Sequence, residues 1–109
     1  MEWAKENFNQ QRYSDAIYHS YNVFVNSAKA YLLNKGIIVN TQIGILNDFE
    51  TQSAAEDRLQ VPGGFKDSVL RINKNEPTEQ FAQHYLSDAE IFLHAVLEIR
   101  KLQLEAVTV

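Results

Sequence analysis

Residues 15–35, DAIYHSYNVFVNSAKAYLLNK, decide the fold of this chain. Their apolar and small residues recur at three- and four-residue spacing, so they lie on one face of a helix. Small side chains follow one ridge of this face and large side chains follow the ridge beside it. A partner helix can therefore approach closely while aromatic side chains fill the flank. The pattern predicts a long helix that packs on another helix through Ala16, Ile17, Ser20, Val23, Phe24, Ser27, Ala28 and Tyr31.

A second long helix is predicted at residues 78–105. At 1.5 Å per residue it would be about 40 Å long. That length exceeds the diameter of about 26 Å expected for a compact domain of this size. We expect the end of this helix to project from the domain or to pack on something else. Its main apolar stripe consists of Ala82, Tyr85, Leu86, Ala89, Phe92, Leu93, Val96 and Ile99.

Shorter segments accompany the two long helices. Residues 2–10 and 64–73 read as helices, and a third short helix runs through Ile43, Leu46 and Phe49. The polar stretch 51–60 is ambiguous, and the only β-like run, residues 36–40, is too short and isolated to form a sheet. The fold class predicted is all-α, an antiparallel up-and-down helical bundle of four to five helices. It forms a single domain over residues 1–109, either complete or as a piece of a larger protein.

The predicted helix ends depend on a few capping and turn residues. Ser14 is a plausible N-cap for the second helix, and Gly36 follows it as a helix-ending residue should. Thr41 is expected to cap the third helix, with Gly44 inside it or near its start. Pro62, Gly63 and Gly64 mark a turn.

Composition excludes several function classes. The chain has 109 residues, 45% of them apolar, and no cysteine, which rules out a disulfide framework, thiol catalysis and iron–sulfur ligation. The formal net charge is −4, so bulk nucleic-acid binding through positive charge is not expected. No apolar run approaches the ~20 residues that span a bilayer, so we expect no membrane partner. These features are compatible with a cytoplasmic location.

The sequence resembles HEPN domains (higher eukaryotes and prokaryotes nucleotide-binding). The resemblance is carried by RYSDAIYHSY at residues 12–21, AKAYLL at 28–33, Gly36, and the turn TQIGI at 41–45. It extends into the last helix, through Tyr85, Ala89 and Phe92. It implies an up-and-down bundle of four to five helices that often forms a dimer, with a nucleotide as a ligand.

Many HEPN proteins are ribonucleases with an Arg-x(4–6)-His motif near the start of the last long helix. His84 stands where that histidine would be, but residues 75–83 contain no arginine, and Arg71 is 13 positions away. We therefore predict no catalytic residue and no cofactor. One alternative is a divergent ribonuclease that uses His84 or His19 with Arg71 or with an arginine of a dimer mate. Another is an accessory C-terminal domain of the sulfite/nitrite reductase-like proteins of Bacteroidetes.

Four polar residues are the candidate ligand-binding set. Asp15, His19 and Asn26 lie along the second helix, and His84 belongs to the last one. A polar pocket could bind the hydrogen-bonding edge of a ligand, although a histidine satisfied by Asp15 four residues earlier is the simpler interpretation.

Two carboxylate–histidine pairs with i,i+4 spacing occur in the last helix. They are His84–Asp88 and Glu90–His94. The two histidines point to different sides of the helix, and no Glu-x-x-His motif occurs, so we predict surface ion pairs and no metal site.

A second, thinner apolar stripe on the last helix predicts association. It consists of Ile91, Ala95 and Leu102, and a similar minor stripe on the second helix consists of Tyr18, Val25 and Leu33. An extra apolar face means either burial on both sides or a partner. The favoured hypothesis is a non-catalytic HEPN-like module that forms a homodimer, or docks on a protein partner or parent polypeptide. A nucleotide could bind in a cleft between the long helices.

Overall fold

The computed structural model describes the backbone of residues 1–61 and 64–107, and their side chains as far as Leu102. Over these residues the chain is helical and contains no strand, so the prediction of an all-α bundle of four to five helices is confirmed. Two single-turn 3-10 helices, η1 and η2, link the main helices. The elements are α1 (Glu2–Asn9), α2 (Tyr13–Asn34), α3 (Gln42–Gln52), η1 (Asp57–Leu59), α4 (Phe65–Leu70), η2 (Arg71–Asn73) and α5 (Glu79–Val107).

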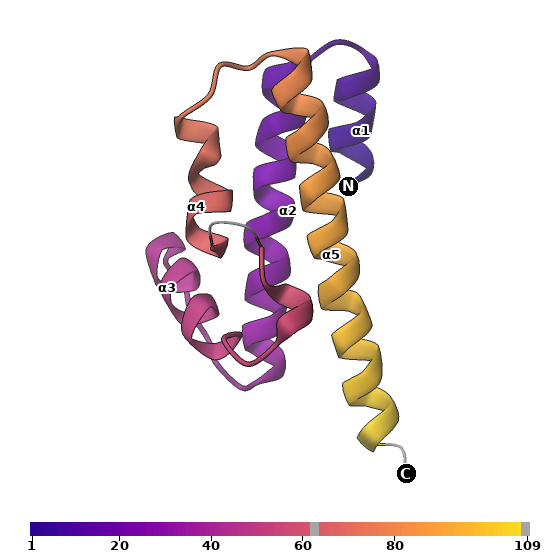
Figure 1. Ribbon diagram of the computed structural model, residues 1–109. Helices are drawn as coiled ribbons and strands as arrows, with labels where there is room; N and C mark the ends of the chain where they lie inside the picture. The colour runs from indigo at the N-terminus through magenta and orange to yellow at the C-terminus, as the bar shows by residue number, and fades with distance from the viewer. Residues whose placement is uncertain (62–63, 108–109) are drawn as a thin grey trace.

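The long helices α2 and α5 form the centre of the bundle. Helices α1, α2, α4 and α5 alternate in direction, as an up-and-down bundle requires, so α2 and α5 run the same way (Figure 1). α1 packs on α2 and α5, while α3 and α4 lie on the other side of α2. Of the eight residues predicted for the α2 face, seven are buried and Val23 is partly buried.

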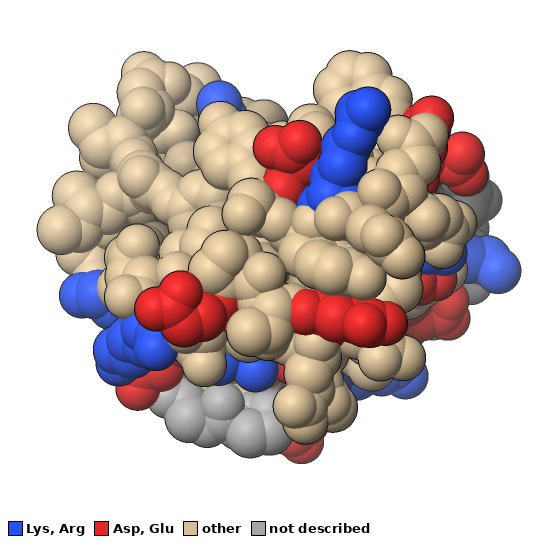
Figure 2. Space-filling view, turned by 90° about the horizontal axis from the view of Figure 1, so that it is seen from above, with Lys and Arg blue, Asp and Glu red and all other residues tan. Residues whose placement is uncertain are grey.

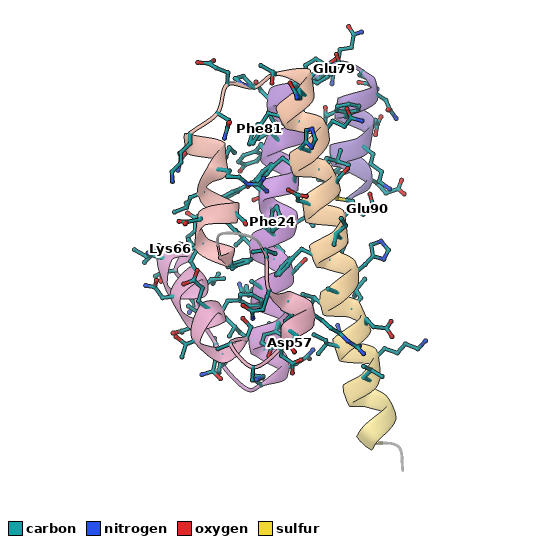
Figure 3. The ribbon with its side chains drawn as sticks, in the orientation of Figure 1. Phe24, Asp57, Lys66, Glu79, Phe81 and Glu90 are labelled. Carbon is teal, nitrogen blue, oxygen red and sulfur yellow. The ribbon has the colours of Figure 1, made fainter. Side chains whose placement is uncertain are left out.

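The core is an aromatic cluster to which four helices contribute. Phe49 of α3 and Phe65 of α4 have ring centroids 4.4 Å apart, and Phe65 lies 5.1 Å from Phe92 of α5. Phe24 of α2 lies 5.5 Å from Phe92 and 5.3 Å from Tyr85. Figure 3 shows Phe24 in the interior, whereas Glu79 and Lys66 point outward. Rings at these separations add directional contacts to the burial of apolar area, so this cluster fixes how the helices meet.

The ends of α2 and α3 follow the predicted glycine and threonine signals. Gly36 adopts φ +77°, and the amides of Gly36 and Ile37 donate to the carbonyls of Leu33 and Leu32, which closes α2 in a Schellman motif.

At the start of α3, the Thr41 hydroxyl accepts from the Gly44 amide at 3.2 Å. A Cβ atom at Gly44 would lie 2.7 Å from both Thr41 Oγ1 and Val39 Cγ1, so the cap requires glycine there.

The predicted start of α2 was wrong by two residues. Ser14 is not the N-cap, because the Arg12 carbonyl already accepts the Ala16 amide at 2.9 Å and Tyr13 is helical. The chain reverses one residue earlier, at Gln11, whose φ is +62°. A polar residue in the left-handed region makes this turn without glycine, which gave no signal in the sequence.

α5 projects beyond the rest of the bundle, as its length predicted. Its 29 residues correspond to about 44 Å of helix. The molecule measures 46 Å along its long axis but only 26 and 24 Å across, and Figure 1 shows the C-terminal turns of α5 extending past the other helices. In the ambiguous stretch 51–60, α3 ends and η1 follows. Two residues of the predicted turn, Pro62 and Gly63, lie outside the described residues.

Candidate functional site

The four predicted ligand-binding residues do not converge within the described part of the chain. His19 is partly buried on α2, where its ring centroid lies 5.5 Å from that of Trp3 on α1. Asp15, Asn26 and His84 are exposed, and no hydrogen bond or ion pair between described residues joins any two of the four. His19 is therefore placed against Trp3 rather than held by Asp15. Its role in ligand binding stays a prediction.

The structure gives Asp88 a different partner from the predicted one. Its carboxylate accepts from Arg71 Nη2 at 2.7 Å, so the predicted His84–Asp88 pair was wrong. The guanidinium is always charged, and η2 brings it across to α5, whereas the His84 side chain is exposed. The Glu90–His94 pair is present at 3.9 Å, and Glu90 also binds Lys5 of α1 at 2.9 Å.

Arg71 is held in place by further contacts besides Asp88. Its Nε donates to the Ser68 carbonyl at 3.3 Å, and its Cζ lies 5.5 Å from the centre of the Tyr85 ring. Tyr85 is itself fixed, because its buried hydroxyl donates to the Val69 carbonyl at 2.7 Å. Burial raises the pKa of Tyr85 well above its usual range, and the nearby Arg71 charge opposes that rise only in part. This set of contacts joins η2 and α4 to α5.

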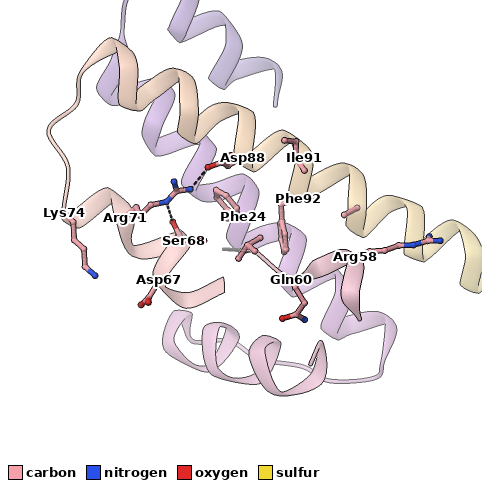
Figure 4. A pocket seen from close by; sticks show the side chains of 12 residues that line it. Phe24, Arg58, Gln60, Asp67, Ser68, Arg71, Lys74, Asp88, Ile91 and Phe92 are labelled. Carbon is pink, nitrogen blue, oxygen red and sulfur yellow. Dashed lines mark hydrogen bonds and ion pairs between the residues drawn. The ribbon is translucent and has the colours of Figure 1, made fainter. Parts of the chain in front are cut away.

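Beside this ion pair lies a cavity of about 470 Å³, between α5 on one side and η1, α4 and η2 on the other (Figure 4). Phe24 and Phe92, both almost fully buried, form its floor, and Ile91 and Ala95 contribute apolar surface from α5. Charged side chains surround it, namely Arg58, Asp67, Arg71, Lys74 and Asp88. A volume of this size falls within the range of small-molecule sites.

Sequence reasoning missed this cavity. Arg58 comes from the stretch that was ambiguous in the sequence, and Asp67 and Lys74 come from a short helical segment without a distinctive motif. One signal was present, because Ile91 and Ala95 had been singled out as an apolar stripe away from the main core. The two residues border the cavity rather than only the outer surface of α5.

The predicted partner stripe on α5 is largely exposed. The exposed fraction is 69% for Ile91 and 44% for Leu102, while Ala95 between them is partly buried. The stripe thus runs from the rim of the cavity toward the projecting end of α5. The minor stripe on α2 is less continuous, since Tyr18 and Leu33 are exposed but Val25 is partly buried.

Surface charge and possible metal ligands add no further candidate among the described residues. Seen from above, acidic and basic side chains are interspersed rather than gathered by sign (Figure 2). Among the described residues, no three or more acidic or histidine side chains are arranged to hold a metal ion. No helix within the same residues has the length and apolar character needed to cross a membrane.

Comparisons of this chain with protein-family models, curated proteins and solved structures found no match. The resemblance to HEPN domains therefore stays a prediction carried by the quoted residues.

Proposed function

We propose that this chain is a non-catalytic helical module of HEPN-like type that associates with a second protein, first of all another copy of itself, through the outer face of α5. We call this face the α5 stripe, and it consists of Ile91, Ala95 and Leu102. The observation that supports the proposal is the exposure of two large aliphatic side chains, 69% for Ile91 and 44% for Leu102, on a helix that already buries a separate row of apolar side chains in the core.

The spacing along the α5 stripe suits a two-fold contact. An interface between two copies uses the same patch on each, so the patch must complement itself. Ala95 is small and allows close approach near the middle of the stripe, while Ile91 and Leu102 are large and lie toward its ends. In an antiparallel contact, the large side chain at one end would meet the large side chain at the other.

Association is tested by size-exclusion chromatography with light scattering over a wide range of protein concentration. The wild-type chain, 12.5 kDa as a monomer, is expected to elute with twice that mass. The double variant Ile91→Asp, Leu102→Asp is expected to be monomeric, because two buried carboxylates would face each other in the contact. The matched control is Ile43→Asp, a comparably exposed helical isoleucine (64%) on α3, which should leave the dimer intact. A wild-type monomer at all concentrations would refute self-association.

The ribonuclease alternative needs an arginine to act together with a histidine. Arg71 is the arginine named for that role, and its guanidinium is engaged by Asp88 and the Ser68 carbonyl. The test is cleavage of RNA by the purified protein. Cleavage that disappears in His84→Ala would establish the alternative, and no cleavage by the wild type would reject it.

A further inference from the structure

The cavity above Phe24 and Phe92 combines an apolar floor with an excess of positive charge at its rim. Three cationic residues, Arg58, Arg71 and Lys74, stand against two carboxylates, Asp67 and Asp88. The rim therefore carries one net positive charge, although the whole chain carries −4. A local charge opposite to that of the molecule favours an anionic ligand.

The cations at the rim have unused hydrogen-bonding capacity. Arg58 and Lys74 are exposed, and neither side chain makes a hydrogen bond or ion pair within the described residues. Arg71 uses two of its N–H groups, one for Asp88 and one for the Ser68 carbonyl. A guanidinium has five N–H donors, so three are left for a second acceptor.

Figure 4 shows Arg71 reaching from η2 to Asp88 along one edge of the cavity, with Arg58 and Lys74 on opposite sides. The contacts with Asp88, Ser68 and Tyr85 hold the Arg71 guanidinium in one orientation. An ordered guanidinium is the group best suited to bind a carboxylate through paired hydrogen bonds.

The geometry points to a binding site for a carboxylic acid with an apolar body, whose carboxylate binds Arg71 while its chain or ring lies on Phe24, Phe92, Ile91 and Ala95. Burial of the ligand would cover apolar surface that is otherwise open to water, which is the main source of affinity in such sites. Ile91 and Ala95 also belong to the α5 stripe, so the ligand and a second copy of the chain would use part of the same surface. Arg71 lies outside the stripe and serves the ligand site alone.

The charge at the rim also selects the number of negative charges on the ligand. One net positive charge balances one carboxylate. A nucleoside triphosphate would bring several negative charges close to Asp67 and Asp88. Its polar sugar and phosphates would also find few hydrogen-bonding partners on the aromatic floor. The site therefore favours a monoanion over the nucleotide that the family resemblance implies.

The experiment is isothermal titration calorimetry of the full chain with octanoate, 2-naphthoate, 1-octanol and ATP. Octanoate and octanol share a chain length, so their comparison isolates the carboxylate, and naphthoate distinguishes an aromatic from an aliphatic body. We expect one carboxylate ligand to bind per chain, about tenfold more tightly than octanol, as a charge-assisted hydrogen bond provides. Arg71→Gln should remove that tenfold difference. Its matched control, Arg100→Gln, changes an exposed arginine of α5 outside the cavity and should change nothing.

A second variant tests the apolar half of the site without touching its charge. Ala95→Phe places a ring in the cavity and should abolish binding of octanoate, whereas Ala55→Phe, at an exposed position away from the cavity, should not. Circular dichroism of each variant checks that the helices are retained. The proposal is overturned if no carboxylate binds to saturation, if octanol binds as tightly as octanoate, or if ATP binds more tightly than both. Chromatography of Arg71→Gln separates the two proposals, since this variant should keep the oligomeric state of the wild type.

Discussion

The two faces of α5 carry similar side chains and have opposite environments. On the inner face, Tyr85 and Phe92 are buried against α2, α3 and α4, with exposed fractions of 0 and 2%. On the outer face, Ile91 directly precedes Phe92 in sequence and is 69% exposed. Apolar periodicity identifies both stripes, but only the number of neighbouring helices decides which stripe is covered. Within the described residues, the neighbouring helices cover one side of α5, and the other side borders an open cavity.

Truncation of one residue on each face is the strongest test of this contrast. Phe92→Ala removes a ring that contacts three other aromatic residues and should lower the free energy of unfolding by about 3–5 kcal/mol. Ile91→Ala, one position earlier, should change it by no more than about 0.5 kcal/mol, since that side chain is mostly in water. Urea unfolding followed by circular dichroism measures both. The measurement should be made at a protein concentration where both variants are monomeric. Similar losses of unfolding free energy in the two variants would contradict the difference in burial between the two faces of α5.

The inner face was predictable because burial follows helical periodicity directly. The spacing of Ala82, Tyr85, Ala89 and Phe92 placed them on one side of a helix, and each is buried. The capping role of Thr41 was equally local, since its hydroxyl needs only an amide three residues later. Gly36 supplied the positive φ that ends α2.

The surroundings of the outer face were not predictable, because they depend on contacts between distant segments. The sequence predicts that Asp88 pairs with His84 in the same helix. In the structure Asp88 instead binds Arg71, which lies 17 residues away. The cavity likewise forms only when Arg58 and Lys74 are brought to α5 by segments with weak helical patterns. Local sequence also concealed the turn at Gln11, which uses a positive φ at a residue that rarely adopts one.

The hydroxyl of Tyr85 provides a smaller test of the inner face. In the wild type, the Tyr85 hydroxyl donates to the Val69 carbonyl at 2.7 Å. Tyr85→Phe keeps the ring packing but leaves this carbonyl without its buried donor. Loss of such a bond should cost about 1–3 kcal/mol of unfolding free energy. The control is Tyr18→Phe, whose hydroxyl belongs to a side chain that is 57% exposed and should be neutral. An equal effect of the two variants in urea unfolding would show that the buried hydroxyl does not fasten α4 to α5.

Alkaline pH should expose the burial of Tyr85 in the free energy of unfolding. Burial raises the native pKa of Tyr85, so above the ordinary tyrosine pKa of about 10 the unfolded chain loses a proton that the native protein keeps. Below that pH, protonated Tyr85 makes its full contribution to the free energy of unfolding. As the pH rises above it, the free energy of unfolding falls by up to about 1.4 kcal/mol per pH unit. Tyr21, whose pKa is also raised by burial, adds to the loss.

The measurement is the free energy of unfolding of wild type and Tyr85→Phe at several pH values around 10. The variant should lose less stability than the wild type over this range, because one of the two linked protons is absent. Parallel curves for wild type and Tyr85→Phe would mean that Tyr85 ionises in the native protein as easily as in the unfolded chain.

The ion pair at the boundary between the two faces should have the smallest effect on stability. Arg71 and Asp88 form a bond of 2.7 Å, but their side chains are 35 and 45% exposed, so water and salt screen much of the attraction. A double-mutant cycle of Arg71→Ala and Asp88→Ala should give a coupling of about 0.2–1 kcal/mol that declines with added salt. The pair would then contribute mainly by orienting the guanidinium beside the cavity, while the aromatic contacts of the inner face hold the helices together. A coupling energy well above that range and insensitive to salt would show that the ion pair is shielded from water like the core. The two faces of α5 would then not differ as described.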